Sequence, residues 1–222
     1  MLFALNGSTI MTAPQAAEIE AASRAGFPLL ELRAPKVRDF LAHHSAADLG
    51  ALLREGGVRP LSINSLEKAT MRPEGEWPQV EAECRELAAL AGEIACPYLL
   101  VIPGPAPAGA TAADIRRETA GQLRALAALA SAHGVRLGFE FLGFGWCSVG
   151  RLEQAAEIVA DVARPDVGLV LDTCHFYASG SPLEALDQLD ASRLFIVHVN
   201  DCPHMPRDRI QDADRVMPGH GV

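Results

Sequence analysis

Three short apolar runs in the second half of the chain each carry an acidic or imidazole side chain near their far end. The runs read RLGFEFLG, VGLVLDTCH and LFIVHVND, and these side chains are Glu140, Asp172 and His198. Runs of this length and composition are typical of strands buried on both faces of a parallel sheet. The spacing is 32 residues from Glu140 to Asp172 and 26 from Asp172 to His198, which leaves room for one helix in each interval. The pattern predicts successive βα units of an α/β fold.

The same spacing extends back to the start of the chain. Strands are expected to begin 26 to 38 residues apart, near Leu2, Pro28, Pro60, Tyr98, Arg136, Val167 and Leu194. A (β/α)8 barrel has about 30 residues in each unit and needs eight strands to close. We therefore expect residues 1–222 to form a single TIM barrel domain that lacks the eighth βα unit in this chain. Uncovered sheet edges pair readily, so aggregation, a homodimer or weak stability is expected.

In such a barrel the carboxyl ends of the strands meet at one mouth, which would bring Glu140, Asp172 and His198 together. Two carboxylates and an imidazole suit a divalent cation such as Mn²⁺, Zn²⁺, Co²⁺ or Mg²⁺. Glu140 lies between Phe139 and Phe141 in an apolar run, so its carboxylate is expected to be buried. Burying a carboxylate without a partner costs free energy of desolvation, and a bound cation would offset that cost. The structural alternatives are that Asp172 caps the next helix and that His198 is a hydrogen-bonded core histidine. His175 and Asp201, close to these strands, are also of metal-binding type.

Local patterns give further expectations for the connecting segments. A helix should run to Gly26 with Ala16, Ile19 and Ala22 facing inward, and a short helix should cover residues 181–189. Residues 66–77 are polar and interrupted by Pro and Gly, which predicts a loop covering a site. Trp146, in the loop after Glu140, is a candidate wall for a sugar, with a packed loop anchor as the alternative.

Composition limits the function classes. The formal charge of -9, with only 19 Lys and Arg, argues against a nucleic-acid partner. The N-terminus has no basic leader and the chain no 18-residue apolar stretch, so neither export nor membrane insertion is expected. Five cysteines without a CxxC pair indicate reduced thiols in a cytoplasm. Among them, Cys174 and Cys202 lie near the predicted site. Each could be a nucleophile, and the structural alternative is that each only fills the core.

Several motifs in order along the chain carry a resemblance to a known family. They are LLELR, LSINSL, GFEFLG, GLVLDTCHF, FIVHVND and DRVMPGHG. With these motifs the chain resembles the sugar phosphate isomerase/epimerase group of xylose-isomerase-like TIM barrels, and within it the inosose (2-keto-myo-inositol) isomerases. The likeness covers nearly the whole chain.

The resemblance implies roles for individual residues. Three of the four metal ligands of the family match Glu140, Asp172 and His198, and the fourth, a Glu after strand eight, has no counterpart in this sequence. Substrate-contacting residues of the family match His175 and Arg215. For Arg215 the structural alternative is an ion pair with Asp212 or Asp214. Asn6, which ends the first strand, is a further substrate-binding candidate. With three protein ligands, weak metal binding and slow or absent turnover are expected.

The implied reaction moves a carbonyl along a keto-sugar or keto-inositol, or inverts its α-carbon. Glu140 would take a proton from carbon, Arg215 would stabilise the enediolate, and His175 would orient a hydroxyl. An inosose-type dehydratase and an inactive homologue are alternatives. An apurinic endonuclease is disfavoured, because strands two and three end near Glu31 and Asn64 where that class needs histidines.

Overall fold

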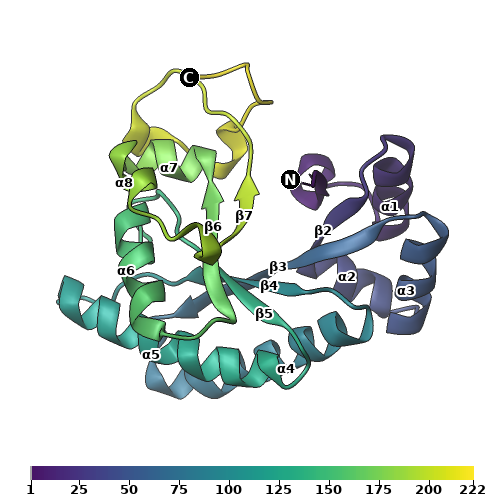
Figure 1. Ribbon diagram of the computed structural model, residues 1–222, viewed down its shortest axis with the longest axis horizontal. Helices are drawn as coiled ribbons and strands as arrows, with labels where there is room; N and C mark the ends of the chain where they lie inside the picture. Colours follow the sequence, from purple (N-terminus) through teal and green to yellow (C-terminus); the bar gives the residue numbers. More distant parts are fainter. Residues whose placement is uncertain (1) are drawn as a thin grey trace. The chain divides into compact units, whose positions relative to one another are not determined.

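The computed structural model describes residues 2–222, in which seven strands form one sheet in chain order, β1-β2-β3-β4-β5-β6-β7 (Figure 1). The pairs β1–β2, β2–β3, β5–β6 and β6–β7 are parallel. The strands are β1 (Ala4–Asn6), β2 (Leu29–Arg33), β3 (Arg59–Thr70), β4 (Tyr98–Pro103), β5 (Arg136–Glu140), β6 (Val167–Asp172) and β7 (Leu194–His198). The expected α/β fold of TIM barrel type is confirmed, and no eighth βα unit occurs within residues 2–222.

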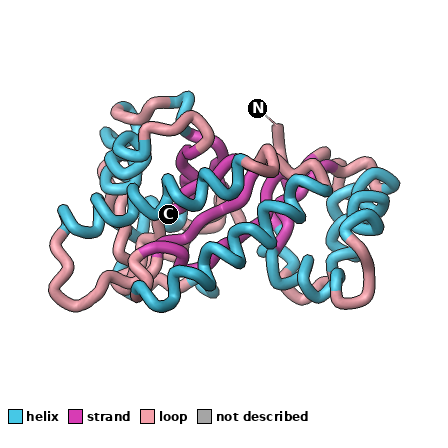
Figure 2. The backbone as a smooth tube through the Cα atoms, turned by 90° about the horizontal axis from the view of Figure 1, so that it is seen from below, coloured by secondary structure: helices cyan, strands magenta, loops and turns pink. Residues whose placement is uncertain are grey.

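Helices alternate with the strands along the chain, as the cyan and magenta segments of Figure 2 show. They are α1 (Gln15–Arg24), α2 (Ala34–Leu41), α3 (Ala46–Glu55), α4 (Trp77–Glu93), α5 (Ala112–Ser131), α6 (Leu152–Val162), α7 (Thr173–Ser179) and α8 (Glu184–Asp187). Short 3₁₀ turns are η1 (Gly7–Ile10), η2 (Glu74–Glu76), η3 (Ala191–Arg193), η4 (Arg207–Arg209) and η5 (Asp212–Asp214). Within the described residues, no helix is long and apolar enough to cross a membrane.

The chain divides into two compact units. The first comprises the residues up to Leu66 with Gln79–Leu100 and Ala128–Arg136, and the second comprises Glu67–Pro78, Val101–Ala127 and Leu137–Val222. The single domain over residues 1–222 stays a prediction. Since Glu140, Asp172 and His198 all belong to the second unit, the candidate site can be described within that unit alone.

In the first unit, a buried ion pair replaces part of the expected apolar face of α1. Ile19 and Ala22 are buried as predicted, but Ala16 is exposed, so its predicted inward position is wrong. The fully buried Glu18 takes this face, because Lys36 Nζ of α2 lies 2.9 Å from Glu18 Oε1. Lys36 also donates to the carbonyls of η1, and these bonds offset the cost of burying the two charges.

Two local features of the second unit differ from the expectations drawn from the sequence. The predicted loop after residue 66 begins later, since β3 continues to Thr70, where Ala69 and Thr70 are buried and Gly104 N–H donates to the Thr70 carbonyl at 3.1 Å. In addition, no separate helix was predicted for Thr173–Ser179, where α7 begins directly after Asp172. With seven residues, α7 is too short to show a helical period in sequence.

Candidate metal centre

Glu140, Asp172 and His198 are the final residues of β5, β6 and β7. Asp172 lies directly opposite His198 in the parallel register, and Glu140 pairs with Val170 of the same β6 strand. This register brings one potential ligand atom from each residue within 4.8 Å of the others. The predicted convergence of the three side chains is therefore confirmed.

All three side chains are shielded from solvent. Glu140 is 4% exposed, Asp172 3% and His198 9%, and His198 Nδ1 lies 3.0 Å from Glu140 Oε1 and 4.0 Å from Asp172 Oδ2. Two buried carboxylates so close together repel each other unless positive charge lies between or beside them. The donor set of two carboxylates and one imidazole fits a divalent cation of borderline to hard character, so these residues could hold one.

Asp172 performs the capping role that was its structural alternative, and it also belongs to the group of potential ligands. Its Oδ1 accepts the backbone N–H of His175 at 2.9 Å, as the N-cap of α7. Burial alone would raise the pKa of Asp172, but positive charge from His175, when protonated, and from Arg215, together with this hydrogen bond, holds the pKa below its usual value. Asp172 is therefore ionised near neutral pH.

His175 lies between two hydrogen-bond donors. Gly143 N–H points to its Nδ1 at 3.3 Å, and Arg215 Nη2 lies 2.9 Å from its Nε2. Burial lowers the pKa of His175 to about 4, so the ring is neutral near pH 7 and can accept at only one nitrogen. The loop reaches this close because residue 143 is Gly, since a Cβ there would lie 2.4 Å from the His175 carbonyl oxygen.

Arg215 joins the group from a segment far along the chain. Its Nη2 lies 3.5 Å from Asp172 Oδ2, and its Nη1 donates to the carboxylate of Asp212. The ion pair with Asp212 that was the alternative role is thus present together with the site contacts, whereas Asp214 instead accepts from Gln211 N–H.

Asp201 anchors the segment that carries Arg215. Its backbone exchanges two hydrogen bonds with Val216, and its Oδ2 accepts the N–H groups of Gly219 and Gly221. Its carboxylate is therefore engaged as a turn former and lies outside the group of potential metal ligands found among the described residues.

An aromatic chain leads from His175 to Trp146. The ring of Phe144 packs edge-on against His175 at 4.8 Å between centroids, and Trp146 lies 6.5 Å from Phe144. Trp146 is 45% exposed, and Lys68 Nζ lies 5.7 Å from its ring centroid. Trp146 thus packs against Phe144 with one part of its side chain and exposes another part to solvent. The packed loop anchor that was the alternative for Trp146 is instead the buried Phe144.

The other residues named from sequence are not among the potential metal ligands found in the described residues. Cys174 and Cys202 are buried, and burial raises the pKa of both thiols, which fits core filler and not nucleophiles. Asn6 belongs to the first unit, where its Nδ2 donates to Glu31 and its Oδ1 accepts from Ser8 N–H.

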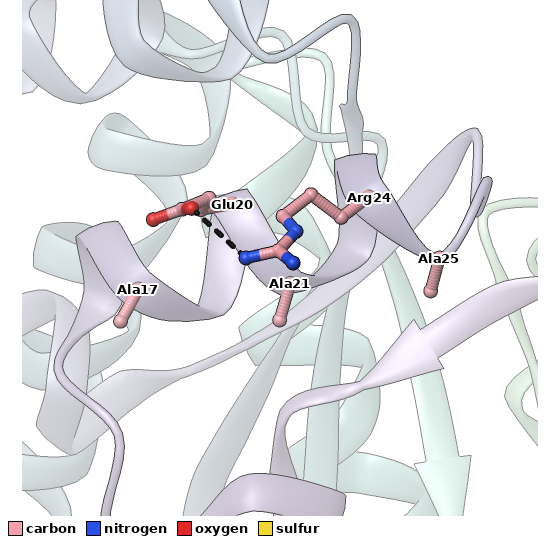
Figure 3. A pocket seen from close by; sticks show the side chains of 5 residues that line it. All are labelled: Ala17, Glu20, Ala21, Arg24 and Ala25. Carbon is pink, nitrogen blue, oxygen red and sulfur yellow. Dashed lines mark ion pairs between the residues drawn. The ribbon is translucent and has the colours of Figure 1, made fainter.

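Within the described residues, one surface hollow in each unit has no potential metal ligand in its lining. One, of about 480 Å³, lies on α1, where an exposed pair between Arg24 and Glu20 spans 3.6 Å (Figure 3). Its other lining residues are alanines, which offer no chemistry. The other hollow, of about 500 Å³, is lined by parts of residues 143–154 and 178–180 and by Arg207 and Asp208.

Comparison with known proteins agrees with this arrangement. The family model described as xylose isomerase-like TIM barrel matches residues 19–222. Inosose isomerase of Bacillus velezensis is 32% identical over 206 residues, which is 92% of this chain and 74% of that protein. Inosose isomerase of Halalkalibacterium halodurans is 31% identical over the same share of the chain and 73% of its own length. A crystal structure of the IOLI protein with a binding zinc atom superposes with a TM-score of 0.96 at 30% identity, covering 100% of this chain and 81% of that one.

Proposed function

The chain belongs to the xylose isomerase-like TIM barrel family, and we propose that it is a divalent-metal-dependent isomerase or epimerase of a keto-sugar or keto-inositol. The observation that carries the proposal is the buried group of Glu140, Asp172 and His198, with His175 and Arg215 bonded beside it. The inosose isomerases among the relatives and the zinc atom in the similar structure support it. Inositol catabolism is the matching metabolic context.

Glu140, Asp172 and His198 would hold the cation, as Mn²⁺, Zn²⁺, Co²⁺ or Mg²⁺. When bound, it would supply Lewis-acid polarisation of the substrate oxygens. Asp172 suits this role because its pKa lies below the usual value, so it needs no deprotonation near neutral pH.

Glu140 is the proposed base. A carboxylate oxygen takes the proton from the carbon next to the carbonyl, and the electron pair of the C–H bond moves to form an enediolate. Returning the proton to the former carbonyl carbon, while the proton of the adjacent hydroxyl moves to the former carbonyl oxygen, completes an isomerisation. Returning it to the other face of the carbon that lost it completes an epimerisation.

Arg215 and His175 are the proposed substrate-contacting pair. Arg215 carries a fixed positive charge beside Asp172, where it would stabilise negative charge on the enediolate. Arg215 Nη2 lies 2.9 Å from Nε2 of the neutral His175 ring, and a substrate hydroxyl could take the place of the guanidinium and be oriented by the ring. Trp146 would wall the sugar, and Asn6 is kept as a substrate-binding candidate.

The remaining assignments are also proposals. The substrate is a small polyol or keto-sugar and not nucleic acid, as the net charge of -9 supports. A cytoplasmic location with no membrane partner is supported by five free cysteines. A homodimer is supported by the exposed Val197 and Val199 at the end of the strand order.

The test is proton exchange by NMR in D₂O, with inosose as substrate and with or without added Mn²⁺. An isomerase incorporates deuterium into a product of unchanged composition, in a metal-dependent manner. Loss of water from the substrate would instead indicate a dehydratase, a class that includes a relative 31% identical over 46% of this chain. Neither exchange nor water loss after long incubation at saturating Mn²⁺ would contradict the proposal, because even slow turnover accumulates deuterium in the product.

A further inference from the structure

Asn200 binds the segment that follows β6 through all of its polar atoms. It lies two residues beyond His198, the last residue of β7, in the stretch Val199-Asn200-Asp201. Its backbone N–H donates to Thr173 Oγ1 at 3.0 Å, and its carbonyl accepts from the same hydroxyl at 2.6 Å. Its side-chain Oδ1 accepts Cys174 N–H at 3.1 Å, and its Nδ2 donates to Asp172 Oδ2 at 2.7 Å.

These bonds determine which way the Asn200 amide points. A carboxamide has one accepting oxygen and one donating nitrogen, and a backbone N–H can only donate. Because Cys174 N–H must face the oxygen, the NH₂ group must face Asp172. The reverse orientation would set donor against donor at Cys174 and acceptor against acceptor at Asp172. The network therefore specifies a single orientation.

The two oxygens of Asp172 are held by different partners as a result. Oδ1 accepts from His175 N–H at 2.9 Å and Oδ2 from Asn200 Nδ2 at 2.7 Å, while Arg215 lies further away at 3.5 Å. Two short bonds from two different elements fix the plane of the carboxylate. The rotation of Asp172 is then restricted before any cation arrives, which lowers the entropy lost on binding.

We propose that Asn200 is a positioning residue that orients Asp172 for a divalent cation. This inference rests on the proposed metal site at Glu140, Asp172 and His198. The chemistry of the donor matters, because a neutral amide orients Asp172 without cancelling its charge, as a Lys or Arg in the same place would. Asn200 also links the end of β6 to the end of β7, so the same residue holds the segments that carry two of the three ligands.

The test is calorimetric titration of the metal-free protein with Mn²⁺, comparing wild type with Asn200→Ala and Thr173→Val. The Ala variant loses the side-chain bonds to Asp172 and Cys174. The Val variant loses the two short bonds of the Thr173 hydroxyl, of which none reaches the Asp172 carboxylate. Both should lower the melting temperature to a similar extent, whereas only Asn200→Ala should weaken Mn²⁺ affinity, by about 10- to 100-fold.

Affinity of Asn200→Ala within about threefold of wild type would overturn the inference, as would an equal loss in Thr173→Val. If Asn200→Ala does not fold, Asn200→Leu replaces it, since its side chain keeps the branched shape of Asn but offers no donor to Asp172, and the same loss is expected. Wild type that binds Mn²⁺ but does not isomerise inosose would refute the proposed function and leave the role of Asn200 standing. Wild type that fails to bind Mn²⁺ would overturn both.

Discussion

Two rows of buried polar side chains lie on neighbouring strands, one row in each unit. Their carboxylates differ in the groups that surround them. In the first unit, Glu31 of β2 lies in register with Asn6 of β1 and Ser62 of β3. It is 1% exposed and accepts hydrogen bonds of 2.9, 2.7 and 2.7 Å from Asn6, Ser62 and Asn64. In the second unit, Glu140 and Asp172 share one site with a single imidazole.

The difference separates a structural carboxylate from a candidate ligand. Glu31 has three neutral donors for one negative charge, so burial is compensated by hydrogen bonds within the protein. Glu140 and Asp172 bring two charges together, and His198 and Arg215 lie beside them. A buried carboxylate is therefore a weak sign of a metal site, while two carboxylates and an imidazole at successive strand ends form a strong one.

The largest expected difference between the rows is in turnover. Glu140→Gln is nearly isosteric but cannot accept a proton, so kcat should fall by about 10²- to 10⁴-fold. Glu31→Gln is the matched control, and it should keep most of the wild-type rate. Rates of deuterium incorporation measured by NMR decide the matter, and retention of more than about a tenth of the rate in Glu140→Gln would remove Glu140 as the base.

The second largest difference is expected in the Mn²⁺ affinity of variants in the two rows. Asp172→Ala or His198→Ala removes a proposed ligand and should weaken Mn²⁺ binding by about 100-fold. His204→Ala, at an exposed position close in sequence, should leave the affinity unchanged, and so should Glu31→Gln. Titration calorimetry gives the constants, and equal losses in all four variants would show that the ligands are misassigned.

Stability of the metal-free protein should respond differently in the two rows. Glu31→Ala leaves the donors of Asn6, Ser62 and Asn64 without their acceptor and should cost about 2 kcal/mol. Glu140→Gln removes one of two neighbouring charges, so stability should stay within about 0.5 kcal/mol of wild type. Urea unfolding in the presence of a chelator measures both. A larger loss of unfolding free energy in Glu140→Gln than in Glu31→Ala would contradict the assignment of Glu31 as the structural carboxylate.

The smallest effect concerns pH. The pKa of Asp172 lies below its ordinary value of 3.8 in the folded state, so its ionisation stabilises the fold above that pH, and this contribution is lost as the pH falls through the lowered pKa. Arg215→Met removes a charge that lowers this pKa. Metal-free Arg215→Met should be less stable than wild type by about 1 kcal/mol at pH 6, and the gap should shrink below pH 4. A gap independent of pH would show that Arg215 acts through packing.

Much of the second unit was predictable because each strand end had a local signal. Glu140 among phenylalanines, Asp172 after an apolar run and His198 between valines each predicted a strand ending in a polar group. The barrel pattern then predicted that they meet. Asn200 carried a weaker signal, since residues two apart on an extended segment share a face and Asn200 follows His198 by two.

Other features depend on tertiary contacts that no local pattern contains. Glu18 and Lys36 are 18 residues apart on different helices, and only their packing shows that an ion pair takes the position expected for Ala16. Helix α7 was missed because seven residues show no helical period, although Asp172 had been named as a possible cap, and Asp172 acts both as the cap and as a potential ligand. The role of Asp201 is likewise set by Gly219 and Gly221, far along the chain.

The most direct test of the central claim is to locate the cation. Crystals of the protein grown with Mn²⁺ should show one strong anomalous difference peak in the second unit. We expect that peak about 2.0 to 2.3 Å from side-chain atoms of Glu140, Asp172 and His198. A peak at Glu31 instead, or a strong peak that none of these three side chains contacts, would contradict the account.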